Sequence, residues 1–184
     1  VAEVRNITWS WGGTIPNVKL TYSTNSGSTY LNTISLSAPN GAGSSGGFSY
    51  AWTIPDAIST TVWVKIEDPL DAAVSDTSNA DFKIQGKLVL TAPNGDPDGA
   101  GPLTAERWVT NEVKNIAWST TGTIANVKLE YSTDGGVTYP VGNVIVASIA
   151  NAGSYAWTIP NLSGLATAAS SAVRVRVSSA ADST

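Results

Sequence analysis

The residues best suited to acid–base chemistry in this sequence are 14 Asp and Glu, because the chain contains no His and no Cys. Without His neither a Ser–His pair nor a histidine-ligated zinc site can form, and without Cys thiol catalysis is excluded. Two carboxylates about 5 to 10 Å apart could still hydrolyse a glycosidic bond. The acids lie mostly in expected loops, and none recurs as a matched pair in both halves of the chain. The densest acidic stretch, Glu67–Asp76, is expected to be a solvated loop between two strands rather than a calcium site. The sequence therefore predicts that the protein is not an enzyme.

The best candidate for a metal site is the loop sequence NGDPDGAG at residues 94–101. Asn94, Asp96 and Asp98 place oxygen-bearing side chains at alternate positions, as in the first half of an EF-hand-like loop. Ca²⁺ takes about six to eight oxygen ligands, and the bidentate glutamate of such a loop would fall one place before Glu106. We favour a polar Gly/Pro loop, with bound Ca²⁺ as the alternative, and no other cofactor is expected.

The elements that must position these residues occur twice. VRNITWSWGGTIPNVKLTYSTNSGSTY (4–30) aligns without a gap on VKNIAWSTTGTIANVKLEYSTDGGVTY (113–139), and YAWTIP occurs at 50–55 and again at 155–160. Apolar residues alternate with period 2 in each copy, which is typical of short β-strands. We therefore predict an all-β chain of two tandem immunoglobulin-like antiparallel β-sandwiches.

The alignment predicts two modules, residues 1–86 and 87–184, that differ at their sheet edges. The segment 87–95 is expected to be the first strand of module 2, and module 1 has no counterpart of it. Residues 80–84 are expected to be the last strand of module 1, and module 2 lacks that strand. We expect flanking repeats of a longer parent chain to supply the missing strands. Neighbouring copies that pair through their strand edges are the alternative.

The order of these motifs resembles a known family. I-x-W, then V-K-L-x-Y-S-T-[DN]-x-G, then Y-A-W-T-I-P and an alternating V-[RW]-V strand resemble immunoglobulin-like repeats of very large bacterial secreted and surface proteins. They are also similar to the Ser/Thr-rich module of fungal cell-wall assembly proteins. TAPNG, followed later by Glu106 and Trp108, fits the P-N-G-G-E-x-W opening of such repeats, interrupted by an insertion at 96–105. The resemblance covers nearly the whole chain. It implies a fold and a stalk, spacer or adhesive role, and it brings no catalytic residues.

The sequence STDGGVTY, Ser132–Tyr139, resembles the Asp-box of sialidase-type propellers, which forms a hairpin turn remote from catalysis. Asp134 can accept backbone N–H groups across such a turn, while Gly135 and Gly136 allow positive φ. Module 1 has Asn25 at the position of Asp134, which keeps the turn bonding but removes the charge that a catalytic acid needs. We predict a turn rather than an active site.

Trp63 is the candidate residue for a binding surface. The tryptophans expected in the core are Trp9, Trp52, Trp118 and Trp157. Trp63 instead alternates with Val62 and Val64, so we expect its side chain to face outward, where module 2 has Arg174. A contact with neighbouring protein is the favoured role, and a glycan platform or a position under a loop are the alternatives.

Composition limits the partners further. The net charge is −4 with scattered basic residues, which argues against nucleic acid. No apolar run approaches the roughly 18 residues that a membrane helix needs, so this segment is not expected to insert into a membrane. The chain contains no Met, and we expect it to be a piece of a longer protein. The predicted function is a structural spacer, stalk or filament repeat of an extracellular or cell-surface protein. The alternative is an adhesin or a carbohydrate-binding accessory module that uses Trp63.

Overall fold

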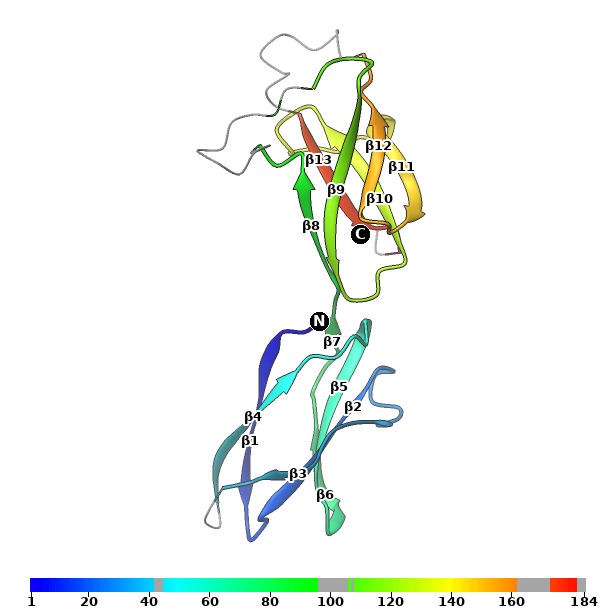
Figure 1. Ribbon diagram of the computed structural model, residues 1–184. Helices are drawn as coiled ribbons and strands as arrows, with labels where there is room; N and C mark the ends of the chain where they lie inside the picture. Colours follow the sequence, from blue (N-terminus) through cyan, green and yellow to red (C-terminus); the bar gives the residue numbers. More distant parts are fainter. Residues whose placement is uncertain (42–44, 96–105, 107, 162–172, 182–184) are drawn as a thin grey trace. The chain divides into compact units, whose positions relative to one another are not determined.

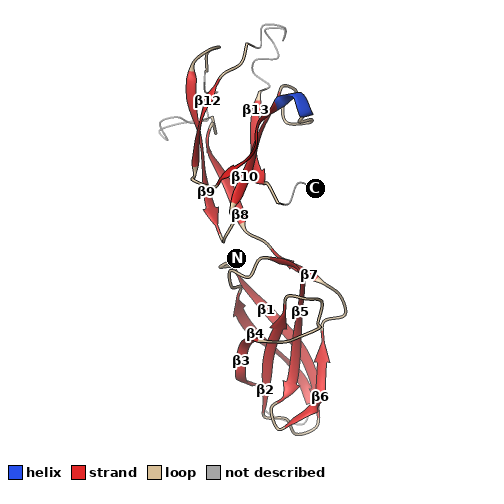
Figure 2. Ribbon diagram, turned by 90° about the vertical axis from the view of Figure 1, so that its right-hand side faces the viewer, coloured by secondary structure: helices blue, strands red, loops and turns tan. Residues whose placement is uncertain are grey.

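The chain forms two compact units, Val1–Gly86 and Lys87–Thr184. The computed structural model describes residues 1–41, 45–95, 106, 108–161 and 173–181. Both units are built from antiparallel sheets (Figure 1), which confirms the prediction of an all-β chain. Figure 2 shows one short helical element, the 3₁₀ turn η1 (Val141–Asn143). Within these ranges the structure contains no helix with the length and apolarity needed to cross a membrane.

Unit 1 contains two sheets. Its strands are β1 (Val4–Gly12), β2 (Asn17–Ser23), β3 (Asn32–Pro39), β4 (Ser45–Thr53), β5 (Ser59–Asp68), β6 (Asp71–Thr77) and β7 (Phe82–Ile84). β1 pairs with β4 in one sheet, and the second sheet has the order β3-β2-β5-β6, with β7 also paired to β5. β7 lies within the predicted last strand at residues 80–84 and is shorter than it.

The period-2 pattern places apolar side chains of both sheets in a common core. Tyr22 of β2, Val62 of β5 and Trp52 of β4 lie in one buried cluster, against which Ile7 of β1 packs. The rings of Tyr22 and Trp52 are 5.3 Å apart between centroids. Each large apolar side chain buried in this way stabilises the unit by about 1.5–3 kcal/mol. The two sheets of unit 1 therefore face each other across a shared core.

Unit 2 repeats this arrangement with a different set of edge strands. Its strands are β8 (Lys87–Ala92), β9 (Val113–Thr121), β10 (Asn126–Ser132), β11 (Val144–Ala150), β12 (Ser154–Thr158) and β13 (Arg174–Ser179). The sheets have the orders β12-β9-β8 and β11-β10-β13. Ile116, Trp118, Leu129 and Trp157 are buried in the core between them. The pairing of β8 with β9 confirms that this segment is a strand of unit 2.

The prediction of a solvated loop at Glu67–Asp76 is wrong. The chain turns after Asp68, whose Oδ1 accepts the N–H of Leu70 at 2.9 Å, and returns as β6. β6 pairs with β5, with Glu67 opposite Ser75. The residues of β6 up to Asp76 are exposed, so backbone pairing rather than side-chain burial holds this strand.

Candidate functional site

The structure describes one of the three proposed calcium ligands, Asn94; Asp96 and Asp98 lie outside the described residues. The backbone N–H of Asn94 donates to Oε1 of Glu106 at 3.0 Å, and Nε1 of Trp108 donates to Oε2 at 2.8 Å. Glu106 therefore joins the two ends of the insertion, and both of its carboxylate oxygens accept a hydrogen bond. The described part of the chain contains no group of three or more Asp, Glu, His or Cys placed to hold a metal ion. Calcium binding stays a prediction.

Trp63 lies against the turn that follows β2. Its Nε1 donates to Oδ1 of Asp81 at 2.7 Å, and a Cβ added at Gly27 would lie 3.0 Å from Cε3 of the indole. The ring is half-buried and in contact with the turn, as in the loop-covered alternative. In unit 2 a Cβ added at Gly136 would lie 3.7 Å from Cγ of Arg174, so the same position again packs under the turn. Binding of protein or glycan by Trp63 stays a prediction.

The turns after β2 and β10 are held by the same kind of side-chain contacts. In unit 2 the hydroxyl of Ser132 donates to Oδ1 of Asp134 at 2.6 Å and accepts the N–H of Gly136 at 2.9 Å. Thr138 donates its N–H to Oδ1 of Asp134 at 2.9 Å and its hydroxyl to Oδ2 at 2.6 Å. The corresponding side chains of unit 1 are those of Ser23, Asn25 and Thr29.

The hydrogen bonds of the turn explain the low pKa of Asp134. Hydrogen bonds from the side chains of Ser132 and Thr138 lower the pKa of this carboxyl from 3.8 to about 2. The ionised carboxylate is an acceptor for local donors, and Asn25 performs the same task without a charge. The structure thus confirms that STDGGVTY is a turn.

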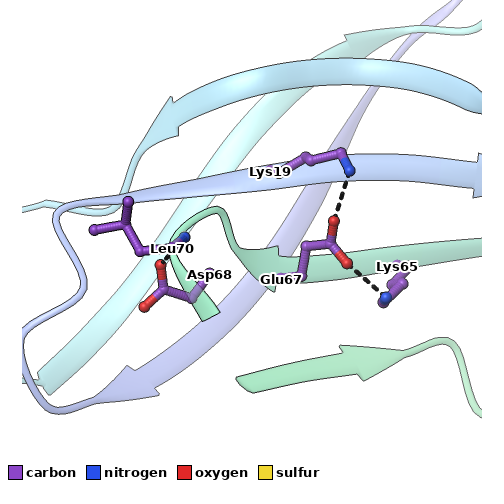
Figure 3. A network of polar contacts seen from close by, with 5 residues as sticks. All are labelled: Lys19, Lys65, Glu67, Asp68 and Leu70. Carbon is purple, nitrogen blue, oxygen red and sulfur yellow. Dashed lines mark hydrogen bonds and ion pairs between the residues drawn. The ribbon is translucent and has the colours of Figure 1, made fainter. Parts of the chain in front are cut away.

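Two other carboxylates are held between cations on the sheets. In unit 1 Glu67 of β5 contacts Nζ of Lys19 at 2.7 Å and Nζ of Lys65 at 2.5 Å (Figure 3). In unit 2 the strands that correspond to β2 and β5 are β10 and β13, and the acid lies on β10 rather than on β13. Glu130 contacts Lys128 of its own strand at 2.6 Å. Its second contact, at 2.7 Å, is to Arg176 of β13.

These ion pairs keep both acids ionised. Hydrogen bonds from Lys19 and Lys65 lower the pKa of Glu67. Burial raises the pKa of Glu130, but the contacts with Lys128 and Arg176 outweigh burial, and the net shift is downward. A general acid that works near neutral pH needs a raised pKa. The lowered pKa of Glu67 and Glu130 therefore does not suit either group to act as a general acid near neutral pH.

An asparagine, buried in unit 1 and half-buried in unit 2, joins the two sheets of each unit, which sequence reasoning missed. In unit 1 the indole Nε1 of Trp9 donates to Oδ1 of Asn40 at 2.5 Å, and Nδ2 of Asn40 donates to the carbonyl of Ile15 at 2.9 Å. Unit 2 has the same contacts. They join Trp118 to Asn151 at 2.6 Å and Asn151 to the carbonyl of Ile124 at 2.8 Å. The available signal was an Asn directly after the third strand in both copies, 31 residues after Trp9 in unit 1 and 33 residues after Trp118 in unit 2.

A groove of about 550 Å³ opens in unit 1 beside β1. Its lining includes Ile7 of β1, Trp52 of β4, Val64 of β5 and Phe82 of β7. Arg5 also lines the groove, and its side chain is exposed. The groove thus combines apolar side chains with polar ones, among them Asn6, Ser78 and Lys83, and it lies beside the edge of a strand.

The chain was also compared with known proteins. No family model matches it, and neither the curated proteins nor the solved structures contain a match.

Proposed function

We propose that the chain is a pair of tandem immunoglobulin-like β-sandwich modules that acts as a structural spacer, stalk or filament repeat of a longer extracellular or cell-surface protein. The observation that carries this proposal is that the polar contacts repeated in both units shape the fold. The Trp–Asn contact fixes a strand end, and the Ser–Asn/Asp–Thr contacts fix a turn. A duplicated module whose shared polar residues are structural is suited to holding a length rather than to performing a reaction.

A single-molecule pulling experiment tests the mechanical part of the proposal. The expected trace has two separate unfolding events, one for each unit, each lengthening the chain by roughly 30 nm at the extended length per residue. The control is the same chain pulled in denaturant, which should extend without force peaks. A single event for the whole chain, or extension without any resisting event in buffer, would contradict the proposal.

An exchange experiment separates a spacer from an adhesin. The pair is replaced in its parent protein by an unrelated rigid pair of β-sandwich modules of equal length. A spacer function predicts that the parent keeps its activity, whereas a flexible Gly/Ser linker of the same number of residues does not restore it. Specific glycan binding by the purified chain that is lost in Trp63→Ala would instead identify an adhesin or carbohydrate-binding module.

A further inference from the structure

The β1-β4 sheet of unit 1 and the β12-β9-β8 sheet of unit 2 differ at one edge. β9 of unit 2 has β12 on one side and β8 on the other, whereas β1 of unit 1 pairs with β4 alone in the described part of the chain. The burial of the core residues beside this edge differs in the same way. Ile116 and Trp118 on β9 are 0% and 5% exposed, but the corresponding Ile7 and Trp9 on β1 are only half-buried. A strand on the free edge of β1 would complete the burial of these two side chains.

Unit 2 also shows what fills the region beside that edge. Trp108, which follows β8 in the chain, packs its ring 6.2 Å from that of Trp157. Leu88 and Leu90 of β8 pack against the same core. In unit 1 the residue that corresponds to Trp157 is Trp52, and it lines the open groove. The groove therefore lies where unit 2 places the indole of Trp108, and the Leu-x-Leu strand of unit 2 corresponds to the adjoining edge of β1.

We infer that the free edge of β1 and the adjoining groove bind an extended polypeptide strand of the β8 kind. The strand runs antiparallel to β1 and carries Leu at alternate positions, followed by a Trp that enters the groove. The register follows from unit 2, where Leu90 pairs with Trp118 and Leu88 with Thr120. By the repeat alignment, the two leucines of the bound strand lie opposite Trp9 and Trp11.

The chemistry of the site favours this occupant over a second β1 edge. An added strand obtains its affinity from main-chain hydrogen bonds and its specificity from pockets for alternate side chains. β1 is nine residues long and has a single charged side chain, that of Arg5, so little on this edge opposes pairing. A second β1 could satisfy the backbone, but it would bring no following indole for the groove lined by Ile7, Trp52 and Phe82. The inference goes beyond the spacer function and does not depend on it.

The test adds a synthetic peptide with the sequence of residues 86–109 to the intact 184-residue chain and follows amide hydrogen exchange by mass spectrometry. We expect saturable binding and about tenfold slower exchange in β1, because amides that join a new ladder become protected. Exchange in β9, which already has β8 on this edge, should stay unchanged. A shorter peptide of residues 86–95, which lacks the Trp, should bind more weakly.

Peptide variants serve as controls, so the fold of the protein is not disturbed. Replacement of both leucines, Leu88→Asp and Leu90→Asp, should abolish binding, and so should N-methylation of alternate peptide amides. The inference is overturned if β1 gains no protection, or if the Asp-substituted peptide binds as well as the parent. It is also overturned if the chain alone sediments as a dimer whose protected β1 the peptide does not displace, which would identify a second copy as the occupant.

Discussion

The substitution Asn40→Ala should destabilise unit 1 strongly, because it removes a fully buried side chain that joins the indole N–H of Trp9 to the carbonyl of Ile15. Asn40 is 0% exposed; it accepts from Nε1 of Trp9 at 2.5 Å and donates to the carbonyl of Ile15 at 2.9 Å. Each buried group left without a partner costs about 1–3 kcal/mol. We therefore expect a loss of about 3 kcal/mol, below the sum of two full penalties because water can enter the space vacated by the amide.

The matched substitution Asn151→Ala in unit 2 should cost less, about 1–2 kcal/mol. Asn151 is half-buried, and the hydroxyl of Thr120 lies 3.0 Å from its Nδ2. That hydroxyl and solvent can take over part of the hydrogen bonding to Trp118 after the amide is removed. The structure thus predicts that Asn40→Ala lowers the unfolding free energy of unit 1 by more than Asn151→Ala lowers that of unit 2.

Urea unfolding followed by NMR measures each unit through its own resonances. With a slope of about 1 kcal/mol per molar urea, the midpoint of unit 1 should fall by about 3 M in Asn40→Ala. In a Trp9→Phe background the same substitution should cost clearly less, because the indole donor is already absent. A shift below about 0.5 M, or equal costs with and without the indole of Trp9, would refute this account of the contact.

Three further predictions concern charge, backbone and metal. The folded pKa of Glu130 lies below its unfolded value of 4.5, so unit 2 should lose stability as the pH falls from 4.5 through the folded pKa. Glu130→Gln should flatten this part of the profile of unfolding free energy against pH. An unchanged profile would contradict the ion-pair assignment. Gly27→Ala should lower the melting temperature of unit 1 more than Gly135→Ala lowers that of unit 2. The φ values are +75° and +78°, but only at Gly27 would a Cβ approach neighbours, at 2.9 and 3.0 Å; equal losses would refute the contact argument. If Ca²⁺ binds at the insertion, EDTA should lower the melting temperature of the chain and Asp96→Asn should remove that sensitivity, whereas no effect of EDTA would end the calcium hypothesis.

The strands that bury one face were predictable, because burial imposes the period-2 pattern on the sequence. β2 and β10 read V-K-L-x-Y in both copies, and their valines and leucines are buried. β6 was not predictable by this rule. Its sequence, DAAVSDT, is exposed along most of its length, and pairing with β5 rather than burial makes it a strand. An edge strand without a buried face leaves little signal in the sequence.

The polar contacts escaped prediction for a related reason. Trp9 and Asn40 are 31 residues apart, and no local pattern indicates that the indole and the amide meet. Glu130 alternates with core residues and so resembles an exposed position. It is only 3% exposed because Lys128 and Arg176 extend over it, which depends on the register of β10 and β13. The turn at Asp134 was predictable, since all its contacts lie within a few residues.

The two ion-pair networks show which differences between the units bear on function. In unit 1 Lys19 of β2 lies opposite Glu67 of β5, and in unit 2 Glu130 of β10 lies opposite Arg176 of β13. The acid therefore lies on the other strand of the pair in unit 2, but it still contacts two cations. Because the network forms with the acid on either strand, its role is to stabilise the pairing of the two strands. A binding partner that required the negative charge at one fixed position would bind only one of the two units. The sheet edges differ within the residues that the structure describes, where no strand pairs with β1 as β8 pairs with β9 and no strand of unit 2 corresponds to β6 on β5. Since the turns and the ion-pair networks are shared by the two units while the strand edges and the burial beside β1 differ, it is at a strand edge that we place the binding proposed above.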